Sequence, residues 1–213
     1  QENVFGTGNY LGIELNTSKS NRTLVLSTVD PYFTIDGISR AVDLFYRSFM
    51  PINSQGEEYE LVTPGATVRF GIPFSEFDTV FLGLGFESTR IAGTVTNKSY
   101  RDYRELYGPS SLAIPLTIGW ARDQRDSVLA PTLGRYQRIN LEWSVGGDVR
   151  YLRANAQYQH YFPITNKFTF GLNAELGWGK GLGSKPYPIF KNFYGGGLGS
   201  VRVFEQGSLG IVD

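Results

Sequence analysis

Side chains alternate between apolar and polar over residues 168–179, and this alternation constrains the fold more than any other feature of the chain. The even positions are Phe, Phe, Leu, Ala, Leu and Trp, whereas the odd positions are Thr, Gly, Asn, Glu, Gly and Gly. A period of two is the pattern of a β-strand with one apolar and one polar face. The segment is therefore predicted to be a strand that has water on one side only.

The same period recurs along most of the chain and predicts an all-β, antiparallel protein of about nine strands. We expect these strands at residues 11–17, 23–29, 38–49, 64–72, 78–87, 112–121, 138–145, 152–162 and 168–179. The 26 glycines and the many aromatic residues also favour strands and turns. No helix longer than one or two turns is predicted, and no run of about 18 apolar residues is available for a transmembrane helix.

A soluble β-sandwich or a lipocalin-like barrel would also alternate, but other features favour a transmembrane β-barrel. Most strands are about ten residues long, enough to cross a bilayer at a tilt, whereas strands of soluble proteins are typically ~5–6 residues. Aromatic residues gather near strand ends, as in an interfacial girdle. The polar face carries charged residues that a water-filled lumen tolerates and a dry core does not: Glu14, Asp43, Arg69, Glu87, Glu142, Arg153 and Glu175.

The connections between strands fall into two alternating sets. One set is mostly short and rich in Pro, Asp and Gly: residues 30–37, 73–77, 122–135 and 163–167. The other set is longer: residues 50–58, 88–111 and everything after 180. Because outer-membrane barrels have short periplasmic turns and longer outside loops, the first set is expected to be periplasmic. Residues 1–180 are thus expected to be barrel strands, and 181–213 a long extracellular or lumenal loop.

An odd strand number is unusual, because single-chain bacterial barrels have an even number. An open sheet would leave unpaired edges in lipid. The sequence is therefore expected to be one portion of a larger barrel.

No combination of residues suggests catalysis, a metal site or a cofactor. His160 is the only histidine, there is no cysteine, and period two places His160 on the apolar face. Lys plus Arg equals Asp plus Glu at 20 each, so nothing indicates a nucleic-acid partner. The chain is expected not to be an enzyme.

The glycine-rich segment 188–210 is either a flexible outside loop or a loop folded into the lumen. It contains Phe190, Phe193, Tyr194 and Phe204 and a single arginine, Arg202. Four aromatic residues favour the lumenal alternative, in which the guanidinium would offer a bidentate contact to lumenal carboxylates.

Several segments resemble the BamA-type outer-membrane insertases, a family that also has the two-partner secretion transporters as relatives. The likeness runs nearly end to end and is strongest in the start of the family's inward-folded loop, in the Val-Arg-Gly-Phe/Tyr signature of that loop and in two periplasmic turns. The matching residues are Asn192, Phe193, Tyr194, Gly195, Gly196 and Gly197; Val201, Arg202, Val203, Phe204 and Glu205; Asp30, Pro31, Tyr32 and Phe33; and Pro131, Thr132 and Gly134.

The resemblance implies a larger barrel of about sixteen strands, an even number as expected. It further implies a location in the outer membrane of a Gram-negative bacterium and a role in assembling and inserting client β-barrel proteins. Outer-membrane lipid and accessory assembly lipoproteins would be the other partners. The alternative is a two-partner secretion transporter or another outer-membrane pore.

By the same resemblance, Arg202 locks the loop inside the lumen against acidic residues on later strands. Position 203 departs from the family, because Val203 stands where the family has glycine. A β-branched residue is costly where glycine supplies a positive φ, so Val203 is expected to weaken docking of the loop.

Overall fold

The computed structural model describes residues 8–18, 21–50, 59–93, 98–165, 167–183 and 186–191. Nine strands form a single sheet in the order in which they occur along the chain, and each pairs antiparallel with its neighbour in sequence. The predicted all-β, antiparallel fold is confirmed. The strands are β1 (Tyr10–Thr17), β2 (Asn21–Asp30), β3 (Ser39–Phe49), β4 (Tyr59–Pro73), β5 (Asp78–Gly93), β6 (Ser110–Asp123), β7 (Gly134–Gly147), β8 (Tyr151–Thr165) and β9 (Phe168–Gly181).

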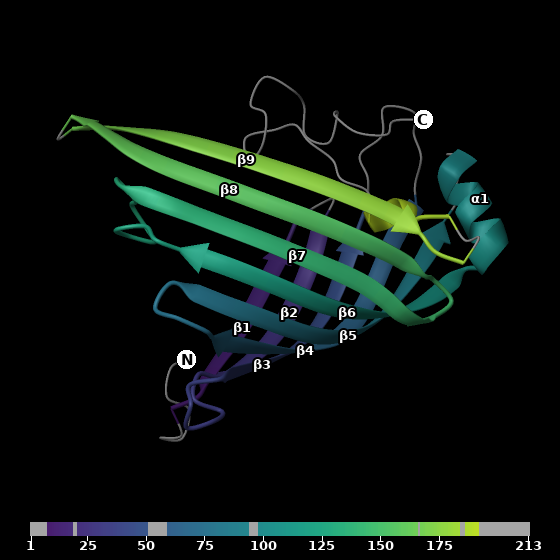
Figure 1. Cartoon of the computed structure of the whole chain (residues 1–213). Helices are drawn as coiled ribbons and strands as arrows, with labels where there is room; N and C mark the ends of the chain where they lie inside the picture. Colours follow the sequence, from purple (N-terminus) through teal and green to yellow (C-terminus); the bar gives the residue numbers. More distant parts are fainter. Residues whose placement is uncertain are drawn as a thin grey trace.

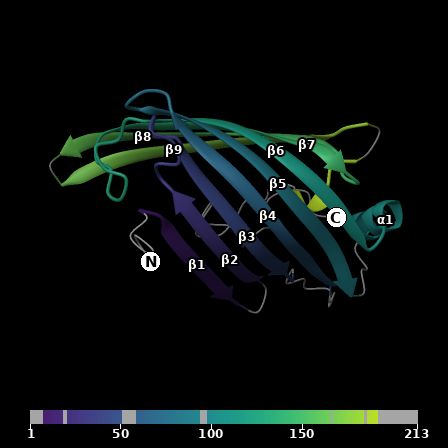
Figure 2. The same ribbon diagram turned by 90° about the horizontal axis from the view of Figure 1, so that it is seen from below.

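The sheet curves into an open trough, with β1 and β9 as its two edge strands (Figures 1 and 2). A helix, α1 (Lys98–Tyr107), lies at one end of the trough, and we call this the α1 end. The short 3-10 helix η2 (Ile189–Lys191) lies on the concave side (Figure 2). The concave face is called the inner wall below.

Apolar side chains of the strands point away from the inner wall. On β5, Leu82, Leu84 and Phe86 are 39 to 53% exposed, whereas Gly83 and Gly85 between them are buried. Other exposed residues of the same outward face are Ile13, Leu15, Leu24, Leu44, Ile118, Ile139, Leu141, Trp143, Leu172, Leu176 and Trp178. Large side chains such as these are usually buried in a water-soluble fold, so their outward rows match the lipid-facing side of a membrane barrel.

Helix α1 corrects one expectation from the sequence. Its 10 residues make nearly three turns at ~3.6 residues per turn, longer than the one or two turns predicted. Tyr100, Tyr103 and Tyr107 recur at the helical spacing of three and four residues and form one face. That face packs toward the inner wall, where Tyr103 is 4% exposed. Burial of this aromatic face stabilises a helix within a strand connection.

Two prolines inside the strands coincide with breaks in register. The β6–β7 ladder shifts between Ile114 and Pro115, and the β8–β9 ladder shifts between Pro163 and Thr165. Proline has no N–H to donate to a ladder and is therefore tolerated at such irregularities.

None of the helices in the described ranges is both long enough and apolar enough to cross a membrane.

Candidate functional site

The inner wall carries charged side chains on both halves of the sheet, as the alternation predicted. On β3 and β4, Asp43 Oδ2 accepts hydrogen bonds from Arg69 Nη2 at 2.6 Å and Arg69 Nε at 3.1 Å. The Ser27 hydroxyl donates to the other Asp43 oxygen at 2.5 Å. On β9, Glu175 accepts from Gln157 Nε2 at 3.2 Å. These hydrogen bonds satisfy polar groups whose burial in a dry core would be unfavourable.

A hollow of about 370 Å³ opens on the inner wall of β1 to β4. Phe45 forms part of its lining, and the Phe45 ring lies directly over Gly65 of the next strand. The other lining residues are Glu14, Val25, Ser27, Asp43, Arg47, Thr67 and Arg69. Most of these side chains are polar, so this half of the wall suits contact with water.

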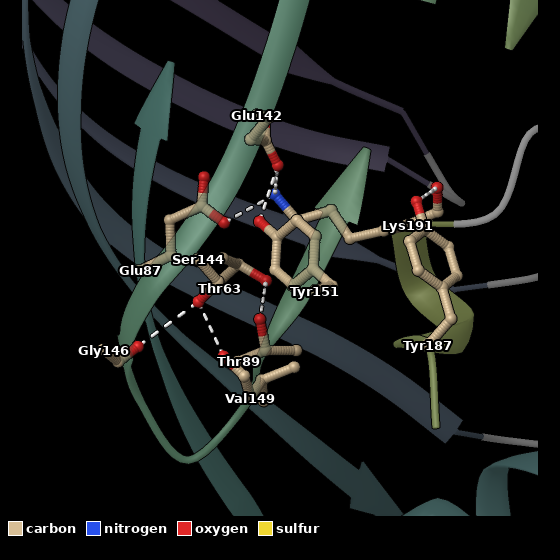
Figure 3. A network of polar contacts seen from close by, with 10 residues as sticks. All are labelled: Thr63, Glu87, Thr89, Glu142, Ser144, Gly146, Val149, Tyr151, Tyr187 and Lys191. Carbon is tan, nitrogen blue, oxygen red and sulfur yellow. Dashed lines mark hydrogen bonds and ion pairs between the residues drawn. The ribbon is translucent and has the colours of Figure 1, made fainter. Parts of the chain in front are cut away.

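The wall of β5 to β8 is arranged differently, because one lysine lies between two glutamates (Figure 3). Lys191 Nζ lies 2.8 Å from Glu87 Oε2 and 3.3 Å from Glu142 Oε1. The Tyr151 hydroxyl donates to Glu142 Oε1 at 2.6 Å. Arg153 stands directly opposite Glu142 in the β7–β8 ladder. We refer to Lys191, Glu87 and Glu142 as the lysine clamp.

An apolar cluster lies beside the lysine clamp at the α1 end. Its buried members come from four strands, helix α1 and the β7–β8 turn: Tyr59, Leu61, Ile91, Tyr103, Ala113, Val149 and Tyr151. Ile189 and Phe190 pack against this cluster together with Tyr187. The segment 186–191, which follows β9, therefore lies against the inner wall and is held there by both apolar and ionic contacts.

The first predicted turn connects β2 and β3. Asp30 Oδ1 accepts a hydrogen bond from the Tyr32 N–H at 3.2 Å. Phe33 packs on Phe70 of β4 with ring centroids 6.0 Å apart, and the Arg40 guanidinium lies 4.2 Å from the Phe33 ring centroid. Pro31 lies between Asp30 and Tyr32 in this turn. Phe33 thus joins the outward face near the end opposite α1.

The second predicted turn, between β6 and β7, is organised by Asp126. Its carboxylate accepts hydrogen bonds from the Thr132 hydroxyl and from the N–H groups of Thr132 and Leu133. These bonds, that of the Thr132 hydroxyl first, lower the pKa of Asp126 to about 2. Pro131 precedes this hydrogen-bonded pair, and Gly134 follows it with a φ of 106°. A β-carbon at 134 would overlap the Gln124 carbonyl oxygen, so glycine is required there.

The remaining predicted site residues lie outside the described residues. These are the signature Val201, Arg202, Val203, Phe204 and Glu205 and the start of the loop, Asn192, Phe193, Tyr194, Gly195, Gly196 and Gly197. Their roles stay predictions.

Sequence reasoning missed the part played by Lys191. Within segment 188–210 the sequence predicts an ionic contact for Arg202 alone. The available signal was Glu87, an inward carboxylate whose cross-strand neighbours, Gly65 and Ala113, carry no charge.

His160 lies on the outward face of β8, as its position in the alternation predicted. Its Nδ1 lies 3.0 Å from the Tyr158 hydroxyl, and its ring stacks on Phe162 with centroids 3.9 Å apart.

Comparison with known proteins identifies the family. The model of the Omp85 superfamily domain matches residues 3–213. The outer membrane protein assembly factor BamA of Neisseria meningitidis serogroup B is 36% identical over 99% of this chain. The protein of the same name from Nitratidesulfovibrio vulgaris is 22% identical over 97% of the chain. The chain spans only 28% and 26% of these two relatives.

A solved structure has the same fold. The crystal structure of BamA from Haemophilus ducreyi lacking POTRA domains 1-3 superimposes with a TM-score of 0.89 at 24% identity. The match covers 99% of this chain and 43% of that one. The fold and inner wall therefore define an outer-membrane β-barrel wall. The chain belongs to the Omp85 superfamily, and the expected likeness to its BamA-type members is confirmed. The expected location, the outer membrane of a Gram-negative bacterium, agrees with this membership.

Proposed function

We propose that this chain is the barrel portion of an insertase that assembles β-barrel proteins and inserts them into the outer membrane. The observation that carries the proposal is the 36% identity, over nearly the whole chain, to a protein named as an outer membrane protein assembly factor. Client β-barrel proteins, outer-membrane lipid and accessory assembly lipoproteins are the partners that this function requires.

The described geometry supports a mechanism that needs no catalytic group. Strands of the sheet pair only with their sequence neighbours, so an edge of such a barrel can offer backbone hydrogen bonds to an incoming client strand. A narrow apolar girdle would also thin the bilayer locally and lower the cost of insertion. On β2 the outward apolar row is short, with Leu24 and Leu26 followed by Thr28 and Asp30, whereas on β9 it runs from Phe168 to Trp178.

The alternative is a two-partner secretion transporter or another outer-membrane pore. Such a pore needs an open lumen, whereas here residues 186–191 and α1 cover part of the inner wall. This cover favours the insertase.

Depletion of the complete protein in living cells tests the proposal. We expect the levels of many unrelated outer-membrane barrel proteins to fall together, because these proteins share one insertion route. Their levels are measured by quantitative proteomics of outer-membrane fractions. Loss of a single exported protein, with the other barrels unchanged, would instead identify a transporter.

A further inference from the structure

After β9 the chain turns back onto the inner wall and fits closely there. The Tyr187 ring lies against Gly179 of β9, where an added β-carbon would come within 2.5 Å of the ring. The same ring meets Tyr151 of β8 edge-on, with centroids 6.0 Å apart. Phe190 meets Tyr103 of α1 in the same manner at 5.4 Å. The segment 186–191 is thus fitted to the wall at several points.

Backbone hydrogen bonds fix the local geometry of Lys191. Its N–H donates to the Pro188 carbonyl at 2.9 Å, and its own carbonyl accepts from the Tyr187 hydroxyl at 3.0 Å. Because both ends of this turn are bonded, the lysine side chain extends from a defined position toward β5 and β7 (Figure 3).

The lysine clamp is largely shielded from water. The side chains of Lys191, Glu87 and Glu142 are 15%, 14% and 22% exposed. Removal of one partner from a buried ion pair is strongly unfavourable, because the other charge stays buried without compensation. Here the ammonium separates two carboxylates. Its loss would leave Glu87 without its ion-pair partner, whereas Glu142 keeps the Tyr151 hydroxyl and still stands opposite Arg153.

We propose that Lys191 is a positioning residue that fixes the place on the inner wall at which the described segment after β9 ends. The clamp joins η2 to β5 and β7 at once, and neither strand is a neighbour of β9 in the sheet. Segment 186–191 therefore ends at one fixed place on the wall of β5 to β8. The consequence for client assembly rests on the proposed insertase function, whereas the clamp itself does not.

Limited proteolysis of the full-length protein in lipid vesicles tests the clamp. Chymotrypsin cuts after Phe190, whereas the bond after Tyr187 resists it because Pro188 follows. The Phe190 bond is protected only while segment 186–191 stays on the wall. Because residue 191 borders the cleaved bond, each rate is divided by that of a free peptide with the same sequence. Lys191→Met keeps a side chain of similar length but removes the charge. We expect normalised cleavage after Phe190 to be roughly tenfold faster or more, because cleavage follows the population of the opened segment.

Arg69→Gln is the matched control. It breaks an ion pair on the other half of the inner wall, that with Asp43, and does not touch segment 186–191. Cleavage after Phe190 should stay at the wild-type rate in this variant. Equal cleavage in Lys191→Met and wild type would overturn the proposal.

A charge swap separates the ionic contribution from simple packing. Lys191→Glu places three carboxylates together and should give the fastest cleavage of the series. Adding Glu87→Lys restores one cation between two carboxylates and should return much of the protection. If the double variant is cut as fast as Lys191→Glu alone, charge does not hold the segment and the proposal is wrong.

A second readout distinguishes this inference from the proposed function. Folding of a client barrel into the same vesicles is measured for each variant. Faster cleavage with slower client folding supports both the clamp and its role in assembly. Faster cleavage with unchanged client folding supports the clamp and counts against its role in assembly.

Discussion

The two halves of the inner wall use ion pairs in different ways. On β3 and β4, Arg69 pairs with Asp43 beside an open hollow, and the arginine side chain is 57% exposed. On β5 and β7, Lys191 pairs with Glu87 and Glu142 beneath a cover of aromatic residues, and its side chain is 15% exposed. The first pair joins adjacent strands, whereas the second joins the sheet to a segment that lies on top of it.

Solvent exposure decides how much each pair matters. An exposed pair gains little, because water screens it and both side chains lose freedom. A shielded pair costs desolvation when it forms, but losing one partner is then severe. The comparison indicates that the hollow half lines a wet lumen and that the clamp half fixes a segment in place.

The largest loss of stability is expected for Tyr151→Ala in the half that contains the lysine clamp. Tyr151 is fully buried and donates to Glu142, so its loss removes an aromatic core contact and leaves the carboxylate without that donor. We expect the free energy of unfolding to fall by about 3–5 kcal/mol. Urea unfolding in lipid vesicles measures it. Tyr46→Ala, at a half-exposed outward position, should cost much less; equal losses would contradict the burial of Tyr151.

A smaller loss of stability is expected for Gly65→Ala in the half that contains the hollow. The new β-carbon would lie 2.3 Å from Phe45 Cζ and 2.8 Å from the Phe86 carbonyl oxygen. Because the neighbouring ring must move, we expect a loss of about 1–3 kcal/mol. The same unfolding assay applies. A second change, Phe45→Leu, should recover part of the loss, and no recovery would show that the backbone contact with Phe86 is the obstacle.

Arg69→Gln should have little effect on stability. The Arg69 side chain is 57% exposed, and Asp43, which is 11% exposed, keeps its hydrogen bond from the Ser27 hydroxyl when the arginine is lost. We therefore expect a change in stability of about 1 kcal/mol or less. A loss as large as that in Tyr151→Ala would show that the hollow is shielded from water in the complete barrel, and the contrast between the two halves would disappear.

The smallest effect concerns Tyr187 in the clamp half at high pH. Burial raises the pKa of Tyr187 to about 12 from its ordinary value of 10.0. A raised pKa means that docking of segment 186–191 is fully favoured below pH 10.0 and weakens as pH rises toward 12.

Ultraviolet titration of wild type and Tyr187→Phe measures this pKa. The difference between the two curves reports Tyr187 alone, and we expect its midpoint near pH 12. A midpoint near pH 10.0 would show that the ring is in water and that segment 186–191 is not docked.

The sequence predicts the sheet well, because every strand residue faces either lipid or the inner wall. The resulting alternation of apolar and polar residues can be read from each segment alone. The sequence does not predict helix α1, although Tyr100, Tyr103 and Tyr107 have the helical spacing, because three residues within a connection between two strands are too weak a signal alone. The lysine clamp could not be found from local pattern. Lys191 acquires its role only when the fold brings it beside two carboxylates far earlier in the chain.

That long separation has a kinetic consequence. The sheet grows by pairing each strand with the one before it, so short-range steps build it from hairpins. The contact between Lys191 and Glu87 spans 104 positions and cannot form until β5 to β9 have aligned. Formation of this ion pair should therefore be among the last events of folding. It would indicate that the register of all five strands is correct.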